Sequence, residues 1–180
     1  MSIVRANKWQ RTDGINYGTI LQVKSTLYTT PTSQSISAQT YTNITGITAT
    51  ITPYSTSSKI LIFARWYGEW SGASPHDHVY FLARGGTRIN VQTSTGTRAS
   101  GLATVSTNYQ ASGDWNNDST PETLSVFTLD SPASTNAVTY TMGCYYYQAG
   151  TLYTNRTVGD TDTGNFERGT SEIILMEIAA

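Results

Sequence analysis

The only two histidines of the chain stand close together, at His76 and His78, with Asp77 between them. In an extended segment both imidazoles lie on one face, where they could share a metal ion. A complete site needs three or four ligands, so carboxylates from elsewhere in the chain would have to finish it. We therefore expect a polar loop edge that leads into a strand, and no metal or other cofactor.

A second group of possible ion ligands is DTDTGNFE, residues 160–167, in which Asp160 and Asp162 alternate. A calcium loop of the EF-hand type has its glycine one place later and a glutamate at position twelve, and neither feature is present here. Asp, Thr, Gly and Asn are also ordinary turn formers. The segment therefore predicts a solvated loop.

The remaining carboxylates and the single thiol form no catalytic pattern. Acids in or near predicted loops are Glu69, Asp77, Asp114, Asp118, Asp130 and Glu167. Glycoside cleavage needs two carboxyls about 5 to 9.5 Å apart, and no spacing in the sequence selects a pair. Cys144 lies in a strand-like segment with no histidine nearby in sequence, which predicts a buried, inert thiol. Since no nucleophile elbow, phosphate loop or dinucleotide fingerprint is present either, we expect no enzymatic activity.

The elements that hold these residues follow from the composition. The 180 residues include 31 Thr, 19 Ser and 12 Tyr, and only 13% are charged, against roughly 25% in typical soluble domains. β-branched and aromatic residues favour strands, so the composition predicts one all-β domain. The net charge of −1 predicts no attraction to nucleic acid or to an anionic membrane. No apolar run approaches the roughly 20 residues of a membrane span.

Short alternating segments separated by turn residues run along most of the chain. Strands are predicted at residues 21–27, 47–51, 59–67, 79–84, 88–92, 102–109, 124–128, 138–146, 151–156 and 171–179. Residues 32–43 are a polar stretch without a predicted strand, and residues 111–122 form a loop around Trp115. Eight to ten strands without a helix predict an antiparallel two-sheet jelly-roll sandwich.

The strand at residues 59–67 is apolar on both faces. Ile60 and Ile62 lie on one face, whereas Leu61 and Phe63 lie on the other. Such a strand is central in its sheet, and its second face must meet a long loop or a neighbouring subunit. The run ILMEI near the end of the chain has the same character, which places the last strand in the middle of a sheet.

Aromatic residues gather at a few points of the predicted strands and loops. Tyr145, Tyr146 and Tyr147 are consecutive, so they cannot all enter one core. Exposed tyrosine and tryptophan mark subunit interfaces or platforms for stacking on sugars. We expect a subunit interface at Phe63, Trp66, Tyr67, Tyr145 and Tyr147. The candidates for contact with a glycan are Trp70 and Trp115.

Over residues 18–180 the strand pattern also resembles that of known proteins. The runs that carry the resemblance are TGITATITPYSTSSKILI, FLARGGTRI, LDSPASTNAVTY, GTLYTNRT and TSEIILMEIAA. They resemble small virion structural proteins of tailed bacteriophages, particularly marine and cyanobacterial phages, that are often described as tail-fibre-like. The pattern is also similar to the trimeric jelly rolls of complement C1q and tumour necrosis factor. The resemblance implies a non-enzymatic homotrimer displayed on a phage particle, as capsid decoration or as a tail or fibre component, and it supplies no functional residues.

Residues 1–18 fall outside this resemblance and contain Arg5, Lys8 and Arg11 beside Trp9. We interpret them as a short arm that docks the jelly-roll domain, residues 19–180, onto another virion protein such as a capsid or tail protein. The alternative is a frayed terminus. The stretch MSIVRANKWQRTDG lacks the apolar core of a secretion signal, so we expect synthesis in the host cytoplasm and incorporation into the virion.

Two other functions stay open on the sequence alone. Loops that carry Trp70, Trp115 and residues 160–167 are candidates for recognition of a host surface glycan. A depolymerase has the least support, because the sequence reveals no carboxylate pair for it.

Overall fold

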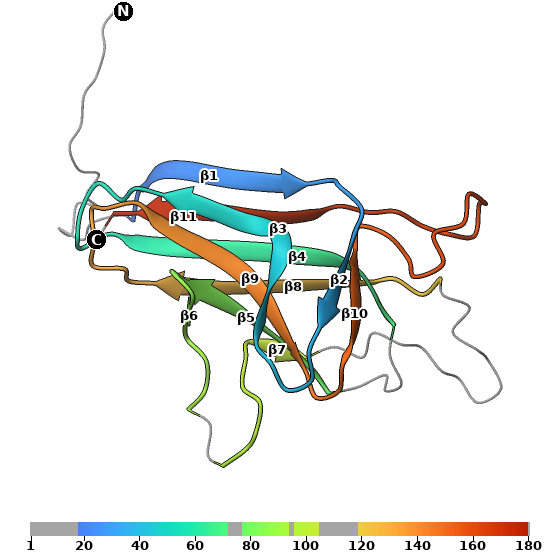
Figure 1. Cartoon of the computed structure of the whole chain (residues 1–180). Coiled ribbons are helices and arrows are strands. Elements are labelled where there is room, and N and C mark those ends of the chain that lie inside the picture. Colours follow the sequence, from blue (N-terminus) through green and yellow to red (C-terminus); the bar gives the residue numbers. More distant parts are fainter. Residues whose placement is uncertain (1–17, 72–76, 94–95, 105–118, 180) are drawn as a thin grey trace, which may run out of the picture.

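The computed structural model describes residues 18–71, 77–93, 96–104 and 119–179, and within these ranges the chain forms strands and no helix (Figure 1). One sheet holds β1 (Ile20–Tyr28), β2 (Thr32–Ile36), β4 (Lys59–Ser71), β8 (Glu122–Asp130), β10 (Gly150–Thr154) and β11 (Ser171–Ile178). The other holds β3 (Thr42–Ile51), β5 (His78–Arg84), β6 (Thr87–Arg88), β7 (Ala103–Thr104) and β9 (Val138–Tyr146). The described ranges contain no helix long and apolar enough to cross a bilayer.

The two sheets pack face to face, and the chain passes repeatedly from one to the other (Figure 1). The long strands of the six-stranded sheet are ordered β1-β11-β4-β8, and those of the five-stranded sheet β3-β9-β5, with every pairing antiparallel. This order, built by connections that alternate between sheets, is that of a jelly roll. The predicted all-β sandwich is therefore confirmed.

The core lies between the sheets and takes alternate side chains mainly from β3, β4, β9 and β11. From β4 it receives Ile60, Ile62, Ala64, Trp66 and Trp70, all buried. The indole Nε1 of Trp70 donates to the hydroxyl of Tyr80 on β5 at 2.8 Å, and that of Trp66 donates to Thr154 at 3.1 Å. Because each buried N–H has a partner, both large rings enter the core without an unpaired donor.

Strand β4 organises the six-stranded sheet because it is longer than any of its partners. It pairs with β8 along one edge, and along the other with β11 over residues 59–65 and then with β10 over residues 68–71. The buried Asn155 closes the fork between β10 and β11: its Oδ1 accepts from Ser171 Oγ at 2.8 Å, and its Nδ2 donates to the carbonyl of Tyr28 at 2.8 Å. The fork therefore keeps its buried polar groups bonded.

The strand predictions agree with the structure in most places. The predicted central position of residues 59–67 and of the last strand is confirmed, since β4 and β11 each pair on both edges. The structure adds β2, whose residues are too polar to show an apolar alternation, and it shortens the predicted strand at 88–92 to β6. Of the strand predicted at 102–109, only β7 falls within the described residues.

Candidate interaction surface

The outer face of the six-stranded sheet, which points away from the core, carries continuous rows of apolar side chains. The first row, across β1, β11, β4 and β8, is Val23, Met176, Leu61 and Leu129. The second row begins at the polar Ser25 on the edge strand β1 and continues with the apolar Ile174, Phe63 and Phe127. The third row brings Glu172 of β11 beside Arg65 of β4, where the apolar character ends. We call the residues of the first two rows the outer apolar face.

Much of this face is open to solvent in the single chain. Phe127 is 71% exposed and Phe63 41% exposed. Most of the large apolar side chains that the described residues leave exposed lie on this side of the sheet, namely Ile20, Val23, Leu27, Phe63, Phe127 and Leu129. Their exposed parts together equal about three whole side chains, or roughly 500–600 Å² at 150–200 Å² for each. This area is at the upper end of what a monomer exposes in one patch, about 300–600 Å².

The centre of the outer apolar face is slightly hollow. Leu61, Phe63, Phe127, Ile174 and Met176 surround a space of about 210 Å³. All five side chains are apolar, so the space offers a hydrocarbon surface and no hydrogen bonds from side chains. A neighbouring apolar side chain would fit it better than a polar ligand.

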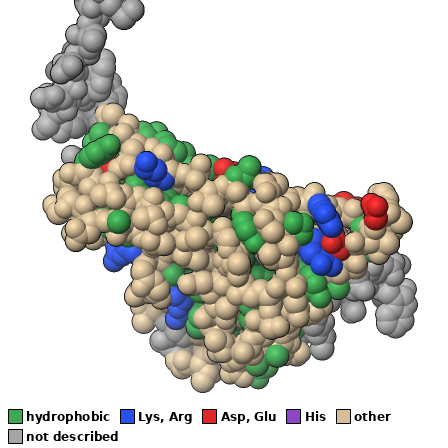
Figure 2. All heavy atoms as spheres, turned by 45° about the horizontal axis from the view of Figure 1, so that its top comes forward, with side chains coloured by type: hydrophobic (Ala, Val, Ile, Leu, Met, Phe, Trp, Pro, Cys, Tyr) green, Lys and Arg blue, Asp and Glu red, His purple; other side chains and the backbone are tan. Residues whose placement is uncertain are grey.

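The outer face of the five-stranded sheet is built differently. Between β3 and β9 it presents paired hydroxyls, with Thr48 Oγ1 3.0 Å from Thr141 Oγ1 and Thr50 Oγ1 2.8 Å from Thr139 Oγ1. Figure 2 shows a side of the molecule on which backbone and uncharged polar side chains predominate, with scattered hydrophobic side chains and with acidic side chains mainly at one end. This part of the molecule is suited to water.

The apolar residues on the outer face of the five-stranded sheet are covered by the chain itself. Phe81 is 2% exposed and lies edge-on against Tyr41, with ring centroids 5.6 Å apart. The Arg88 guanidinium lies 3.5 Å from the centroid of Tyr41 and donates to the carbonyl of Ser100 at 2.7 Å. The Ser100 N–H in turn donates to the Tyr41 hydroxyl at 2.8 Å. The segment after β6 therefore folds back over this face.

The predicted interface residues do not stay together in the structure. Phe63 lies on the outer apolar face, and Tyr67 points to the same side further along β4, where its ring packs over Gly169. The prediction for Trp66 is wrong, because its side chain has the same parity as Ile60 and is fully buried in the core. Tyr145 is corrected too, since it is 7% exposed and packs on Tyr41 of its own chain.

Tyr147, the last of the predicted interface residues, lies beyond the end of β9 and is 54% exposed. It belongs to the five-stranded sheet, so it is not part of the outer apolar face. Its N–H donates to the carbonyl of Asp77.

The predicted glycan contact at Trp70 is wrong. Its ring is 1% exposed and stacks on His78, with centroids 4.6 Å apart, while His78 also stacks on Tyr146. A ring that is covered on both sides by its own chain has no face left for a sugar. Trp115 lies outside the described residues, as do Arg5, Lys8, Trp9 and Arg11 of the predicted arm.

The two segments with possible ion ligands have other contacts. His78 is buried in the aromatic stack, and His76 lies outside the described residues. In the described ranges no three His, Cys, Asp or Glu side chains come together as a metal site. Cys144 is buried as predicted, and burial raises the pKa of its thiol to about 12.

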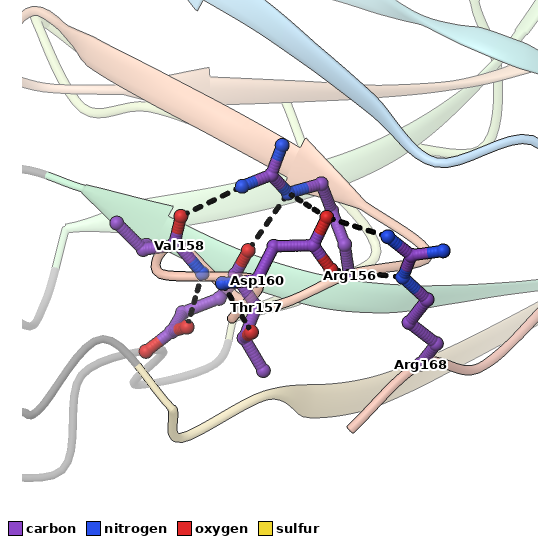
Figure 3. A network of polar contacts seen from close by, with 6 residues as sticks. Arg156, Thr157, Val158, Asp160 and Arg168 are labelled. Atoms are coloured by element: carbon purple, nitrogen blue, oxygen red, sulfur yellow. Dashed lines mark hydrogen bonds and ion pairs between the residues drawn. The ribbon is translucent and has the colours of Figure 1, made fainter. Parts of the chain in front are cut away.

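Asp160 forms a clamp with two arginines (Figure 3). Arg168 donates to both of its carboxylate oxygens at 2.8 Å, and Arg156 approaches within 3.6 Å. Hydrogen bonds from Arg168 hold the pKa of Asp160 below its ordinary value, with the positive charges of both arginines lowering it further against the effect of burial. A carboxylate so occupied by cations is a poor ligand for a metal ion.

Glu69 is a fully buried carboxylate that joins two loops to the end of β4. Its Oε1 accepts from the N–H and the hydroxyl of Thr120 at 3.0 and 2.8 Å, and its Oε2 accepts from the N–H of Val158 at 2.7 Å. Three donors and no open surface suit a structural anchor. The geometry therefore gives this acid no route to a substrate.

The comparisons with known proteins add no relatives: the sequence matches no protein-family model and no curated protein.

Sequence reasoning missed most of the outer apolar face. A strand was predicted at residues 124–128 from the alternation of Leu124, Val126 and Thr128, and no role was given to Phe127 and Leu129, which fall on the opposite parity. That second set of large side chains in β8 was the available signal, since it matches the two-sided character of β4. What no single strand could show is that the two sets meet in register, Phe63 beside Phe127.

Proposed function

We propose that the protein is a non-enzymatic structural protein of a phage particle, in which three copies form a surface-exposed knob through the outer apolar face. The observation that carries the proposal is the exposed pair Phe63 and Phe127 at the centre of two apolar rows. Exposed apolar rows of this extent are a liability for a solitary domain, because they favour aggregation. Burial in a specific assembly removes that liability.

A second copy of the chain is the occupant that fits this face best. An interface between identical copies risks bringing like charges together, which disfavours association. The two apolar rows contain no charged side chain; the charges that flank them along β4 are exposed Lys59 at one end and Arg65, paired in register with Glu172, at the other. The exposed apolar area on this side of the sheet is smaller than the roughly 800 Å² that one partner contributes to a standard interface, so a polar rim around the two rows would supply the rest. The number three comes from the resemblance to trimeric jelly rolls.

The position of the chain ends supports an arrangement with the arm at one end. The N–H of Ala179 donates to the carbonyl of Thr19 at 2.9 Å, so both ends of the described chain lie at the same end of the sandwich (Figure 1). We propose that residues 1–18 attach the knob to another virion protein, on the capsid or the tail. The loops after β10 then point away from the particle.

The decisive measurement is the mass of the full chain in solution by light scattering at micromolar concentration, repeated on residues 19–180. We expect three times 19.6 kDa for the full chain and a trimer for the shortened chain as well. A monomer in both forms contradicts the proposed assembly. Mass spectrometry of purified particles tests the location, and absence of the protein from them contradicts the virion role.

A further inference from the structure

A polar hollow lies at the end of the sandwich opposite to the chain ends. Its volume is about 530 Å³, and it is lined by Asp160, Thr161, Asp162, Thr163, Phe166 and Arg168. All six residues belong to the segment between β10 and β11. The hollow is therefore made by one loop, which we call the tip loop, residues 156–168.

The tip loop is fixed from beneath by the body of the domain (Figure 3). Buried Glu69 accepts from the N–H of Val158, and Arg156 donates to the carbonyls of Thr157 and Val158 at 2.9 and 2.8 Å. The N–H of Asp160 donates to the hydroxyl of Thr157, which is itself fully buried. These hydrogen bonds tie the base of the loop to the body of the domain.

The upper part of the tip loop is held by its own contacts. Arg168 donates hydrogen bonds from Nε and Nη2 to the carboxylate of Asp160, and the hydroxyl of Thr163 donates to Asn165 Oδ1 at 2.6 Å. The N–H of Phe166 donates to the carbonyl of Thr163 at 3.2 Å. A loop ordered in advance loses little conformational entropy on binding, which is the usual design of a recognition surface.

The groups that remain available are suited to a hydroxylated ligand. Thr161, Asp162 and Thr163 are exposed, and Phe166 contributes a half-buried aromatic ring. A hydroxyl group can donate to the carboxylate of Asp162, and a threonine hydroxyl can either donate or accept. Nη1 of Arg168 adds further N–H donors, because the bonds to Asp160 use Nε and Nη2. Together they offer both senses of hydrogen bond beside an apolar surface, as a sugar ring requires.

The charges in the hollow select against ionic ligands. Arg156 and Arg168 already neutralise Asp160, so a metal cation would have to compete with two guanidinium groups. Exposed Asp162 repels phosphate or sulfate from Arg168. A second polar hollow, lined by residues 98–104 with Val79, Gln92 and Thr93, has no aromatic side chain in its lining. The tip loop is therefore the better site for a neutral sugar.

The geometry points to the tip loop as a binding site for an uncharged oligosaccharide, with Phe166 as the stacking surface and Thr161, Asp162 and Arg168 as hydrogen-bonding groups. The role of such a site in contact with a host surface rests on the proposed function, because only a displayed knob would meet that surface. The site itself does not depend on the number of subunits. It replaces Trp70, which the fold buries.

The test is binding of the full chain to an array of neutral oligosaccharides and bacterial surface polysaccharides, followed by titration of the best neutral ligand. We expect Phe166→Ala to weaken binding about tenfold through the lost ring contact, and Thr161→Val to weaken it roughly three- to tenfold through one lost hydrogen bond. Thr139→Val, which removes an equally exposed hydroxyl from the five-stranded sheet, is the matched control and should leave affinity unchanged.

Absence of any neutral ligand on the array overturns the inference, as does a ligand whose affinity both tip-loop variants leave unchanged. If Phe166→Ala fails to fold, Thr161→Val decides alone, because it changes one exposed hydroxyl. The mass of every variant in solution is measured in parallel. A trimer that binds no sugar refutes only the tip-loop site, whereas a monomer that binds sugar refutes only the proposed assembly.

Discussion

The two sheets of this sandwich differ in whether the aromatic side chains on their outer faces are covered. On the five-stranded sheet Phe81 and Tyr145 point away from the core, but Tyr41 and the segment after β6 cover them until less than a tenth of each remains exposed. On the six-stranded sheet Phe63 and Phe127 point outward in the same way and stay open, at 41% and 71%. Both sheets come from one chain with one composition, so composition does not explain the difference.

This contrast shows which of the two outer faces the chain covers with its own residues. The five-stranded sheet finishes its outer face with its own aromatic cover and with paired threonines. Within the described residues the six-stranded sheet has no such cover over its apolar rows, although Thr120 and Val158 do cover the far end of β4 around Glu69. A surface that the chain could have covered and leaves open is the natural place for another molecule.

The largest effect is expected when the open face is given a charge. Phe127→Asp places a carboxylate at the centre of the apolar rows, and burying it unpaired costs several kcal/mol, or about a thousandfold in association at about 4 kcal/mol. We expect a monomer by light scattering at concentrations where the wild type is a trimer. Thr139→Asp makes the same change on the covered sheet and should remain a trimer. Equal masses for the two variants would remove the distinction between the faces.

The next effect belongs to the covered face and to folding alone. At Gly143 of β9 an added Cβ would lie 2.2 Å from Cζ of Phe81, a ring already held by Tyr41. Gly143→Ala should therefore destabilise the domain by about 1–3 kcal/mol through overpacking. Gly164→Ala, where a Cβ meets nothing within 4 Å, is the control in thermal unfolding. Unchanged stability in Gly143→Ala would mean that the cover over Phe81 is loose.

A smaller effect concerns the dependence of folding stability on pH. Burial raises the pKa of Glu177 on β11, but hydrogen bonds, among them those from Gln22 Nε2 and the N–H of Tyr54, lower it by more, to below its ordinary 4.5. A lowered folded pKa gives stability that is present above pH 4.5 and is lost as pH falls through the folded value. The melting temperature should therefore fall less steeply from pH 5 to pH 3 in Glu177→Gln than in the wild type. Parallel curves would show that this carboxylate contributes nothing to acid sensitivity.

The smallest effect is expected at the threonine pairs. Thr50→Val removes the contact with Thr139 Oγ1, but both hydroxyls are exposed and can bond to water instead. The change in the free energy of unfolding should stay within about 0.5 kcal/mol, and the trimer should be unaffected. A loss above about 1 kcal/mol in chemical denaturation would show that the threonine pairs stabilise the fold and are not only a solvated polar surface.

Much of the fold could be read from local patterns. Alternation predicted β1, β3, β4, β9 and β11 because a pleated strand sends successive side chains to opposite faces. The same rule placed Trp66 on the side of Ile60. Trp70 has the same parity, so the rule places it on that side as well if the strand is extended to residue 70. The interface and glycan roles given to these two rings set that parity aside in favour of their position at a strand end, and they were wrong for this reason.

Which side chains share a face of a strand follows from the local sequence, because it depends only on the geometry of the backbone. The sequence also determined the all-β class, through its β-branched and aromatic residues. What lies over each face of a strand depends on the tertiary structure. Pairing between residues far apart in the chain brings Phe63 beside Phe127, closes the segment after β6 over Phe81, and fixes the tip loop on Glu69. These contacts depend on the packing of distant segments, which no local periodicity encodes.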